Sequence, residues 1–196
     1  MLTYFENLLK DISHSVHSLD EGTFNRLVDE CEVVLKGGHK IVVSGLGKNV
    51  PVCDKFVGTM NSLGMNACYM NTNSAVHGDL GMVHDGDLVI VLTKSGSTQE
   101  SVYLVNLLIK RDANIWLLTF TDNSEIEQMI GADKCVVLAL DSEGDDWNIV
   151  PNNSTTVNLI VLQAVAITLS KRLNITLSDF KKNHPGGHIG VQLKNI

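Results

Sequence analysis

A short turn at residues 93–98 carries the residue types in this 196-residue chain that most directly suggest chemistry. It follows an apolar run at 89–92 and contains one glycine and four hydroxyl side chains, those of Thr93, Ser95, Ser97 and Thr98. Apolar residues then recur at helical spacing through 100–108, so the pattern predicts a buried strand, a turn and a helix. Backbone N–H groups and the helix dipole at such a turn attract an anion, most often phosphate. The alternative is that Ser97 or Thr98 only caps the helix.

A second turn, Ser-Gly-Leu-Gly-Lys at 44–48, follows another apolar run at 41–43. It resembles half of a dinucleotide-binding fingerprint, but the later glycine and the acidic residue after the next strand are missing. It is not a P-loop either, because no glycine lies five positions before Lys48. The lysine at its end is suited to stabilising negative charge, and its alternative is a solvated surface lysine.

Composition limits the class of protein. The length and a hydrophobic content of 44% predict one domain over 1–196, with N-terminal helices at 1–36 and an α/β core at 38–196. A net charge of −7 argues against a nucleic-acid partner. No apolar run approaches the roughly 18–20 residues of a membrane span, and no signal peptide is evident. Scattered cysteines are typical of a reducing compartment, so we expect a cytoplasmic protein without a membrane partner.

The periodicity predicts strands that alternate with helices. Apolar, β-branched strands are expected at 41–43, 66–70, 89–92, 115–120 and 135–140. Two helices precede them, and a long apolar helix is expected at 157–173, capped by residues 153–156. This order predicts a three-layer α/β/α sandwich with a five-stranded parallel sheet. Both turns then fall at the carboxyl edge of the sheet, where ligands bind in such folds.

Five motifs in order give a resemblance to a known family. They are the two turns, His77-Gly78-Asp79-Leu80-Gly81-Met82, Asn153-Ser154-Thr155-Thr156 and His184-Pro185-Gly186-Gly187. From about residue 38 onward the chain resembles SIS (sugar isomerase) domains, with their flavodoxin-like fold. It most resembles the arabinose 5-phosphate isomerases among them, which interconvert ribulose 5-phosphate and arabinose 5-phosphate in Kdo biosynthesis. Members often carry a pair of CBS domains after this point, and we expect a short form lacking that pair.

The sequence departs from the family pattern in two places. Asn49 stands where the glycine-lysine turn usually continues with serine. Residues 145–150 replace a stretch that contains cysteine and proline in the family. Both departures bear on which sugar is bound.

The resemblance implies a phosphosugar substrate whose phosphate is held by the 93–98 turn, with Ser44 and Ser154 or Thr155 as second donors. The substrate-binding residues that it implies are Ser44, Gly45, Gly47, His77, Gly78, Asp79, Thr93, Ser95, Gly96, Ser97, Thr98, Ser154 and Thr155. His77 would polarise the carbonyl, bind an adventitious metal or only cap a turn. The chemistry requires no cofactor and no metal.

Isomerisation also needs a base, a donor to the enediolate oxygen and a fixed phosphate. The resemblance carries over four acid/base candidates, Lys48, Glu100, Glu143 and His184. Each has a structural alternative. Glu100 could instead stabilise the helix dipole or form a capping box with Ser97. Glu143 could be a solvated charge on an acidic loop. His184 could be a surface residue of the C-terminal tail.

Two other functions stay open at this point. One is a sugar-phosphate-sensing SIS module without catalysis, and the other is an isomerase of another phosphosugar. In either case we expect a homo-oligomer, a tetramer with sites at subunit interfaces. The N-terminal helices and the helix at 157–173 offer more apolar surface than the sheet needs, and His184 lies in a tail with few anchors.

Overall fold

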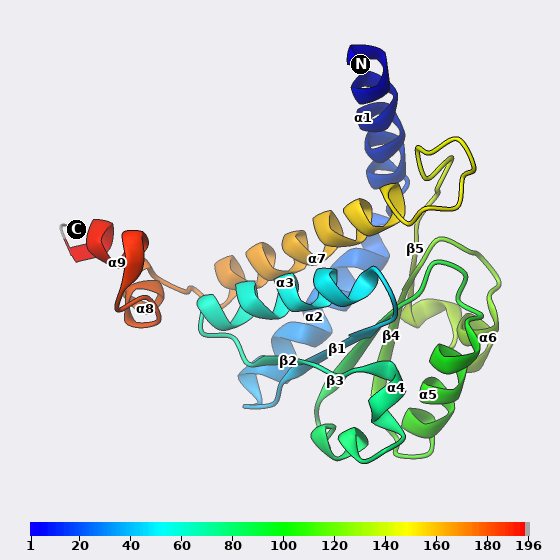
Figure 1. Ribbon diagram of the computed structural model, residues 1–196. Coiled ribbons are helices and arrows are strands. Elements are labelled where there is room, and N and C mark those ends of the chain that lie inside the picture. The colour runs from blue at the N-terminus through cyan, green and yellow to red at the C-terminus, as the bar shows by residue number, and fades with distance from the viewer. Residues whose placement is uncertain (195–196) are drawn as a thin grey trace.

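Five parallel strands form a single sheet in the computed structural model, which describes residues 1–194 (Figure 1). The strands are β1 (Ile41–Gly45), β2 (Ala67–Tyr69), β3 (Leu88–Leu92), β4 (Asn114–Thr119) and β5 (Cys135–Val137). Their order in the sheet is β2-β1-β3-β4-β5, so the chain winds outward in both directions from neighbouring strands β1 and β3. This doubly wound order places ligands at the carboxyl ends of those two strands. The predicted fold class is confirmed.

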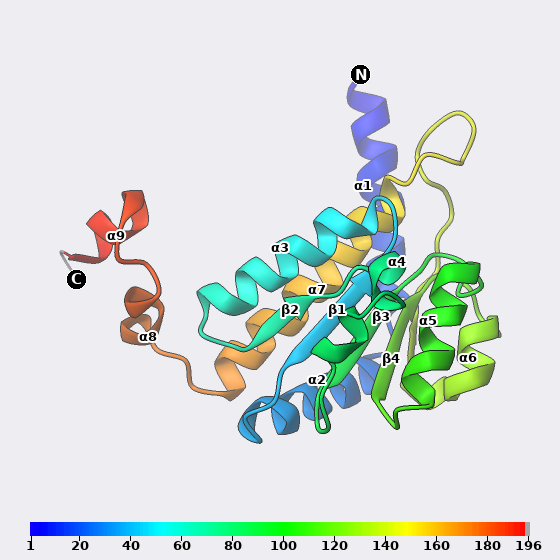
Figure 2. The same ribbon diagram turned by 60° about the horizontal axis from the view of Figure 1, so that its bottom comes forward.

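Helices cover both faces of the sheet (Figures 1 and 2). One face packs against α2 (Glu21–Lys36), α3 (Asn49–Ser62) and α7 (Asn153–Arg172). The other packs against α4 (Thr72–Ala75), α5 (Gln99–Ile109) and α6 (Glu125–Ile130). The remaining helices are α1 (Leu2–His17), α8 (Leu177–Lys182), α9 (Gly187–Lys194) and two short 3-10 helices at Asp79–Met82 and Ala132–Lys134.

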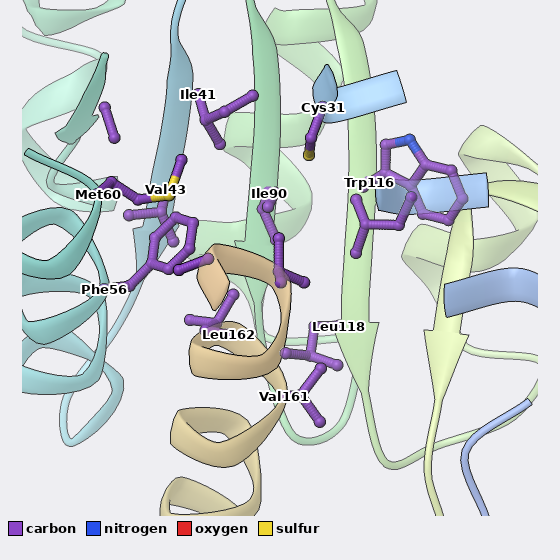
Figure 3. Packing of buried hydrophobic residues seen from close by; sticks show 14 of the residues in the cluster. Cys31, Ile41, Val43, Phe56, Met60, Ile90, Trp116, Leu118, Val161 and Leu162 are labelled. Atoms are coloured by element: carbon purple, nitrogen blue, oxygen red, sulfur yellow. The ribbon is translucent and has the colours of Figure 1, made fainter. Parts of the chain in front are cut away.

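The hydrophobic core follows from the alternation of strand side chains. All five residues of β1 and of β3 are buried, as continuous apolar runs predict. Ile41, Val43 and Ile90 point toward the face that carries Phe56 of α3 and Leu162 of α7, as Figure 3 shows. The intervening residues of the same strands enter a second cluster beneath α5 and α6. The central strands are therefore fixed from both sides, and the turns that follow them start from rigid positions.

Helix α7 is the long apolar helix of the core. Within residues 1–194, its length and composition alone would suffice for crossing a membrane, and half of its apolar window is buried inside the protein. Its buried apolar residues lie along one face and include Val157, Val161, Leu162, Val165 and Leu169. This face packs against α1, α2, α3 and the sheet, so α7 is a core helix here.

The structure corrects some expected element boundaries. Helix α7 begins at Asn153 and not at Val157, because the residues expected to cap it form its first turn. Strand β5 ends at Val137 and not at residue 140. Beyond it, the backbone of Ala139 is hydrogen-bonded to side chains at the end of α1. Ser15 Oγ donates to the Ala139 carbonyl, and the Ala139 N–H donates to Ser18 Oγ. The segment 187–194 forms helix α9, which was not predicted from the sequence of the C-terminal tail.

The two N-terminal helices have different places in the fold. Helix α2 packs directly on the sheet, where Leu27, Val28 and Cys31 are fully or almost fully buried. Helix α1 contacts α7, and its N-terminal half projects from the body (Figure 1). Leu2, Tyr4, Phe5 and Leu9 on this half are exposed.

Candidate functional site

The two turns predicted from the sequence meet at the carboxyl edge of the sheet. They follow the adjacent strands β1 and β3, and a cavity of about 220 Å³ lies between them and the start of α7. Its lining residues are Leu46, Gly47, Lys48, Asn49, Leu92, Thr93, Lys94, Thr98, Ser101, Pro151, Ser154 and Thr155. A larger hollow of about 440 Å³ lies at the opposite end of α3, around residues 63–66. We place the site in the smaller cavity, because only it is lined by the turns and two lysines.

The 93–98 turn presents an uncapped helix start. Gly96 has φ +60, and an added Cβ would collide with the Ser124 side chain, so the tight turn requires glycine. Thr98 is the N-cap residue of α5, but its side chain makes no capping hydrogen bond. The Ser97 hydroxyl instead accepts the N–H of Glu125 at 3.3 Å. The alternative that Ser97 or Thr98 merely caps α5 is therefore wrong, and the first N–H groups of α5 remain available to an anion.

Ser101 adds a hydroxyl group to the same cavity. Its side chain is fully buried, and its Oγ has no hydrogen-bond partner within residues 1–194. Buried polar groups are normally paired, so a buried unpaired hydroxyl that lines a cavity is suited to a ligand oxygen. Ser101 was not among the residues singled out from the sequence, because an isolated serine within a helical repeat carries no signal.

A buried ion pair lies beside the cavity. Lys94 Nζ is 2.7 Å from Glu143 Oε1, and the Glu143 side chain is completely buried. Glu143 also accepts the N–H groups of Asn152 and Ser154, each at 3.0 Å, and the hydroxyl of Ser154 at 2.8 Å. Its carboxylate therefore occupies the N-terminus of α7, where the helix dipole favours negative charge. The alternative of a solvated charge on the acidic loop is wrong.

The pKa of Glu143 is held below its ordinary value. Burial alone would raise it, but the bond from Lys94 and those from the Ser154 and Asn152 N–H groups and the Ser154 hydroxyl outweigh burial. Glu143 is therefore ionised at neutral pH, and Lys94 faces a permanent negative charge.

Three predicted phosphate donors already form hydrogen bonds within the protein. The Ser44 hydroxyl is fully buried, 2.9 Å from the hydroxyl of Thr72, and it does not line the cavity. The Ser154 hydroxyl is used by Glu143. The Thr155 hydroxyl donates to the carbonyl of Asn152 at 3.0 Å, although Thr155 does line the cavity. The structure thus leaves the first N–H groups of α5 as the main source of donors, because the hydroxyls of Thr93 and Ser95 lie 3.2 and 3.4 Å from that of Thr98.

The glycine-lysine turn brings a lysine and an asparagine to the cavity. Lys48 is exposed and stands just before α3, and Gly47 has φ +56. A Cβ on Gly45 would come within 2.9 Å of the Asn49 Cβ, so glycine permits this close approach. The Asn49 side-chain oxygen accepts a bond at 3.0 Å from the buried Asn158. The resemblance drew attention to Asn49, and the structure shows that it is held in the cavity wall.

Glu100 lies in the first turn of α5 with an exposed side chain. It forms no capping box with Ser97, so that alternative is wrong. Glu100 does not line the cavity, although Thr98 and Ser101 on either side of it in the sequence do. His77, Gly78 and Asp79 follow α4 and also lie outside the cavity lining, with His77 exposed.

His184 lies at the far end of α3 from Lys48. Its Nε2 is 2.7 Å from Ser62 Oγ, its Nδ1 is 2.7 Å from the carbonyl oxygen of Phe180, and its ring stacks on Phe180. Helix α3 has 14 residues, which at 1.5 Å per residue separates its two ends by about 20 Å. In Figure 1, α8 and α9 lie at the end of α3 that is remote from the carboxyl edge of the sheet. One chain therefore does not bring His184 to its own cavity.

Comparison with known proteins identifies the family. The model of the SIS domain family matches residues 35–168. The chain belongs to the SIS domain family. This confirms the resemblance drawn from the motifs.

Several relatives of the SIS chain share one name. The protein "Arabinose 5-phosphate isomerase KdsD" of Pseudomonas aeruginosa is 37% identical over 166 residues, which cover 85% of this chain and 50% of that protein. The protein of the same name from Yersinia pestis is 32% identical, over 83% of this chain and 49% of that protein. The chain thus spans about half the length of these curated relatives.

Solved structures share the fold across nearly the whole chain. An Escherichia coli CFT073 protein, solved in complex with arabinose 5-phosphate, superimposes with a TM-score of 0.83 and is 32% identical, covering 93% of this chain and 94% of that one. A putative phosphosugar isomerase of Bacteroides fragilis, described as involved in capsule formation, has a TM-score of 0.86 at 24% identity and covers 96% of this chain and 99% of that one. The second likeness concerns the fold alone.

The turn geometry gives a first prediction. We expect Gly96→Ala to lower the free energy of unfolding by about 1–3 kcal/mol and to weaken phosphate binding, because alanine is strained at φ +60 and its Cβ meets Ser124. Gly58→Ala, at an open position inside α3, is the matched control and should stabilise by about 0.5–1 kcal/mol. Urea unfolding measures both. An unchanged stability of Gly96→Ala would contradict the described turn.

Proposed function

We propose that this SIS protein is an aldose-ketose isomerase that interconverts D-ribulose 5-phosphate and D-arabinose 5-phosphate. The observation that carries the proposal is the cavity at the carboxyl edge, where an uncapped helix start, an unpaired hydroxyl and two lysines suit a phosphate dianion. The names of the relatives and the sugar-phosphate complex of the similar Escherichia coli structure support the choice of sugar. We propose further that the product serves Kdo biosynthesis in the cytoplasm, for lipopolysaccharide or capsule.

The reaction moves a carbonyl group from C2 to C1. A base removes a proton from C1 of ribulose 5-phosphate, and negative charge develops on O2 of the enediolate. A proton is then delivered to C2, while O1 loses its proton and O2 gains one, which leaves the aldehyde. Lys48 lines the cavity, and its positive charge suits the role that we propose for it, stabilising the enediolate oxygen. Of the proposed acid/base residues Glu100, Glu143 and His184, we favour Glu100 as the base, because it is exposed and lies in sequence between the cavity-lining Thr98 and Ser101.

We propose that the site is completed by a neighbouring subunit of a homotetramer. His184 lies about 20 Å from Lys48 along α3, and its tail projects from the body. A projecting tail reaches another copy more readily than its own cavity. The exposed apolar residues on the projecting half of α1 provide surface for the same assembly.

The direct test is turnover of ribulose 5-phosphate by the purified protein, followed by NMR of the product. We expect arabinose 5-phosphate to accumulate, and Lys48→Ala to lower kcat by about 100-fold or more because an enediolate stabiliser is lost. Lys36→Ala, at the C-terminal end of α2, is the control and should leave kcat unchanged. Binding of the sugar phosphate without turnover would support a sensing module, and turnover of another phosphosugar alone would overturn the proposed substrate.

The proposed assembly has its own test. Lys48→Ala and His184→Ala proteins should each be inactive, and mixing them after reversible dissociation should restore part of the activity. Some mixed sites then contain wild-type Lys48 and wild-type His184 from different chains. Lack of recovery despite subunit exchange, followed by mass spectrometry of differently labelled chains, would show that each chain builds its site alone.

A further inference from the structure

Lys94 is a cation of the cavity that the motifs did not assign. Its side chain is 46% exposed while its partner, Glu143, is completely buried, so the pair is open to solvent only on the side of the lysine. Lys94 lines the cavity together with Thr98 and Ser101, which belong to the start of α5. Its ammonium group has three N–H donors, and the contact with Glu143 uses one of them.

The oxygens of Glu143 are already engaged. Oε2 accepts the N–H groups of Asn152 and Ser154, while Oε1 accepts the hydroxyl of Ser154 and lies 2.7 Å from Lys94 Nζ. A proton carrier in an isomerase must reach the substrate, directly or through one water. A fully buried carboxylate bonded in this way does not line the cavity and has no free path to a carbon of the sugar.

The charges around the pair favour a phosphate at Lys94. The negative charge of Glu143 is already stabilised by the N-terminus of α7 and by three N–H or O–H donors besides Lys94. Lys94 therefore retains attraction for a second anion. The uncapped start of α5 and the unpaired Ser101 hydroxyl complete a set of donors around the same cavity.

We propose that Lys94 binds the phosphate group of the substrate and that Glu143 is a positioning residue, which fixes Lys94 at the cavity and caps α7 instead of carrying a proton. The assignment deepens the proposed function and rests on it for the identity of the sugar. It refines the role of Glu143 among the acid/base candidates and leaves proton transfer to Glu100, Lys48 and His184.

The test compares Lys94→Met, Lys94→Arg, Glu143→Gln and the double variant Lys94→Met/Glu143→Gln. Inorganic phosphate is titrated into each by calorimetry, and KM and kcat are measured with ribulose 5-phosphate. We expect Lys94→Met to raise the phosphate Kd and KM by about 10- to 100-fold, because a bond to a charged group is lost. Lys94→Arg should keep most of the affinity. Lys110→Met, on an exposed lysine at the far end of α5, is the control.

The kinetic constants distinguish a positioning role of Glu143 from a role in proton transfer. A positioning role predicts that Glu143→Gln raises the phosphate Kd and KM more than it lowers kcat, and that the double variant is no weaker than Lys94→Met. If kcat instead falls by about 100-fold or more while KM and the phosphate Kd stay unchanged, proton transfer belongs to Glu143 and the proposal is overturned. An unchanged phosphate Kd in Lys94→Met would overturn it as well.

The test remains decisive if Glu143→Gln does not fold. Glu143→Asp keeps the charge but withdraws it by one methylene, so the same rise in phosphate Kd with a smaller loss of turnover is expected. The phosphate titration also separates the two proposals. Phosphate binding that depends on Lys94, in a protein that does not isomerise ribulose 5-phosphate, would overturn the proposed function and leave the role of Lys94 standing.

Discussion

The buried carboxylate of Glu143 at the N-terminus of α7 is the interaction on which the site depends. A buried charge costs several kcal/mol unless it is paired and hydrogen-bonded, and Glu143 meets both conditions through Lys94, Asn152 and Ser154. The pairing joins three separate parts of the chain: the turn after β3, the loop after β5 and the helix that fills the core. The wall of the cavity is thereby tied to the same helix that buries Leu162 against the sheet.

The parallel sheet brings together the two turns that form the cavity. Because β1 and β3 are neighbours that diverge into helices on opposite faces, their two turns meet at one edge. Each turn depends on a glycine at a close approach, Gly45 against Asn49 and Gly96 against Ser124. Backbone N–H groups at a helix start and ammonium groups from both turns are thus held by rigid strands. Fixed donors of this kind favour an anion without reorganisation on binding.

Sequence patterns predicted the features that depend on neighbouring residues. The runs at 41–43 and 89–92, the glycine turns and the amphipathic helices are local signals, and the fold class follows from their order. Such local patterns do not predict contacts between residues that are far apart in the sequence. Lys94 and Glu143 are far apart in sequence, so nothing local showed that a loop carboxylate would be buried against the turn lysine. The early end of β5 was missed for the same reason, because it depends on distant residues. Ser15 and Ser18, at the end of α1, form the hydrogen bonds to Ala139 there.

The central claim is that a sugar phosphate binds between the turn after β3 and the glycine-lysine turn. A titration of isotope-labelled protein with arabinose 5-phosphate, followed by backbone amide NMR shifts, tests it most directly. We expect saturable shifts that are largest at residues 95–101 and 46–49, at the edge lined by Lys94 and Ser101. Shifts confined to residues 63–66, around the larger hollow at the other end of α3, would contradict it.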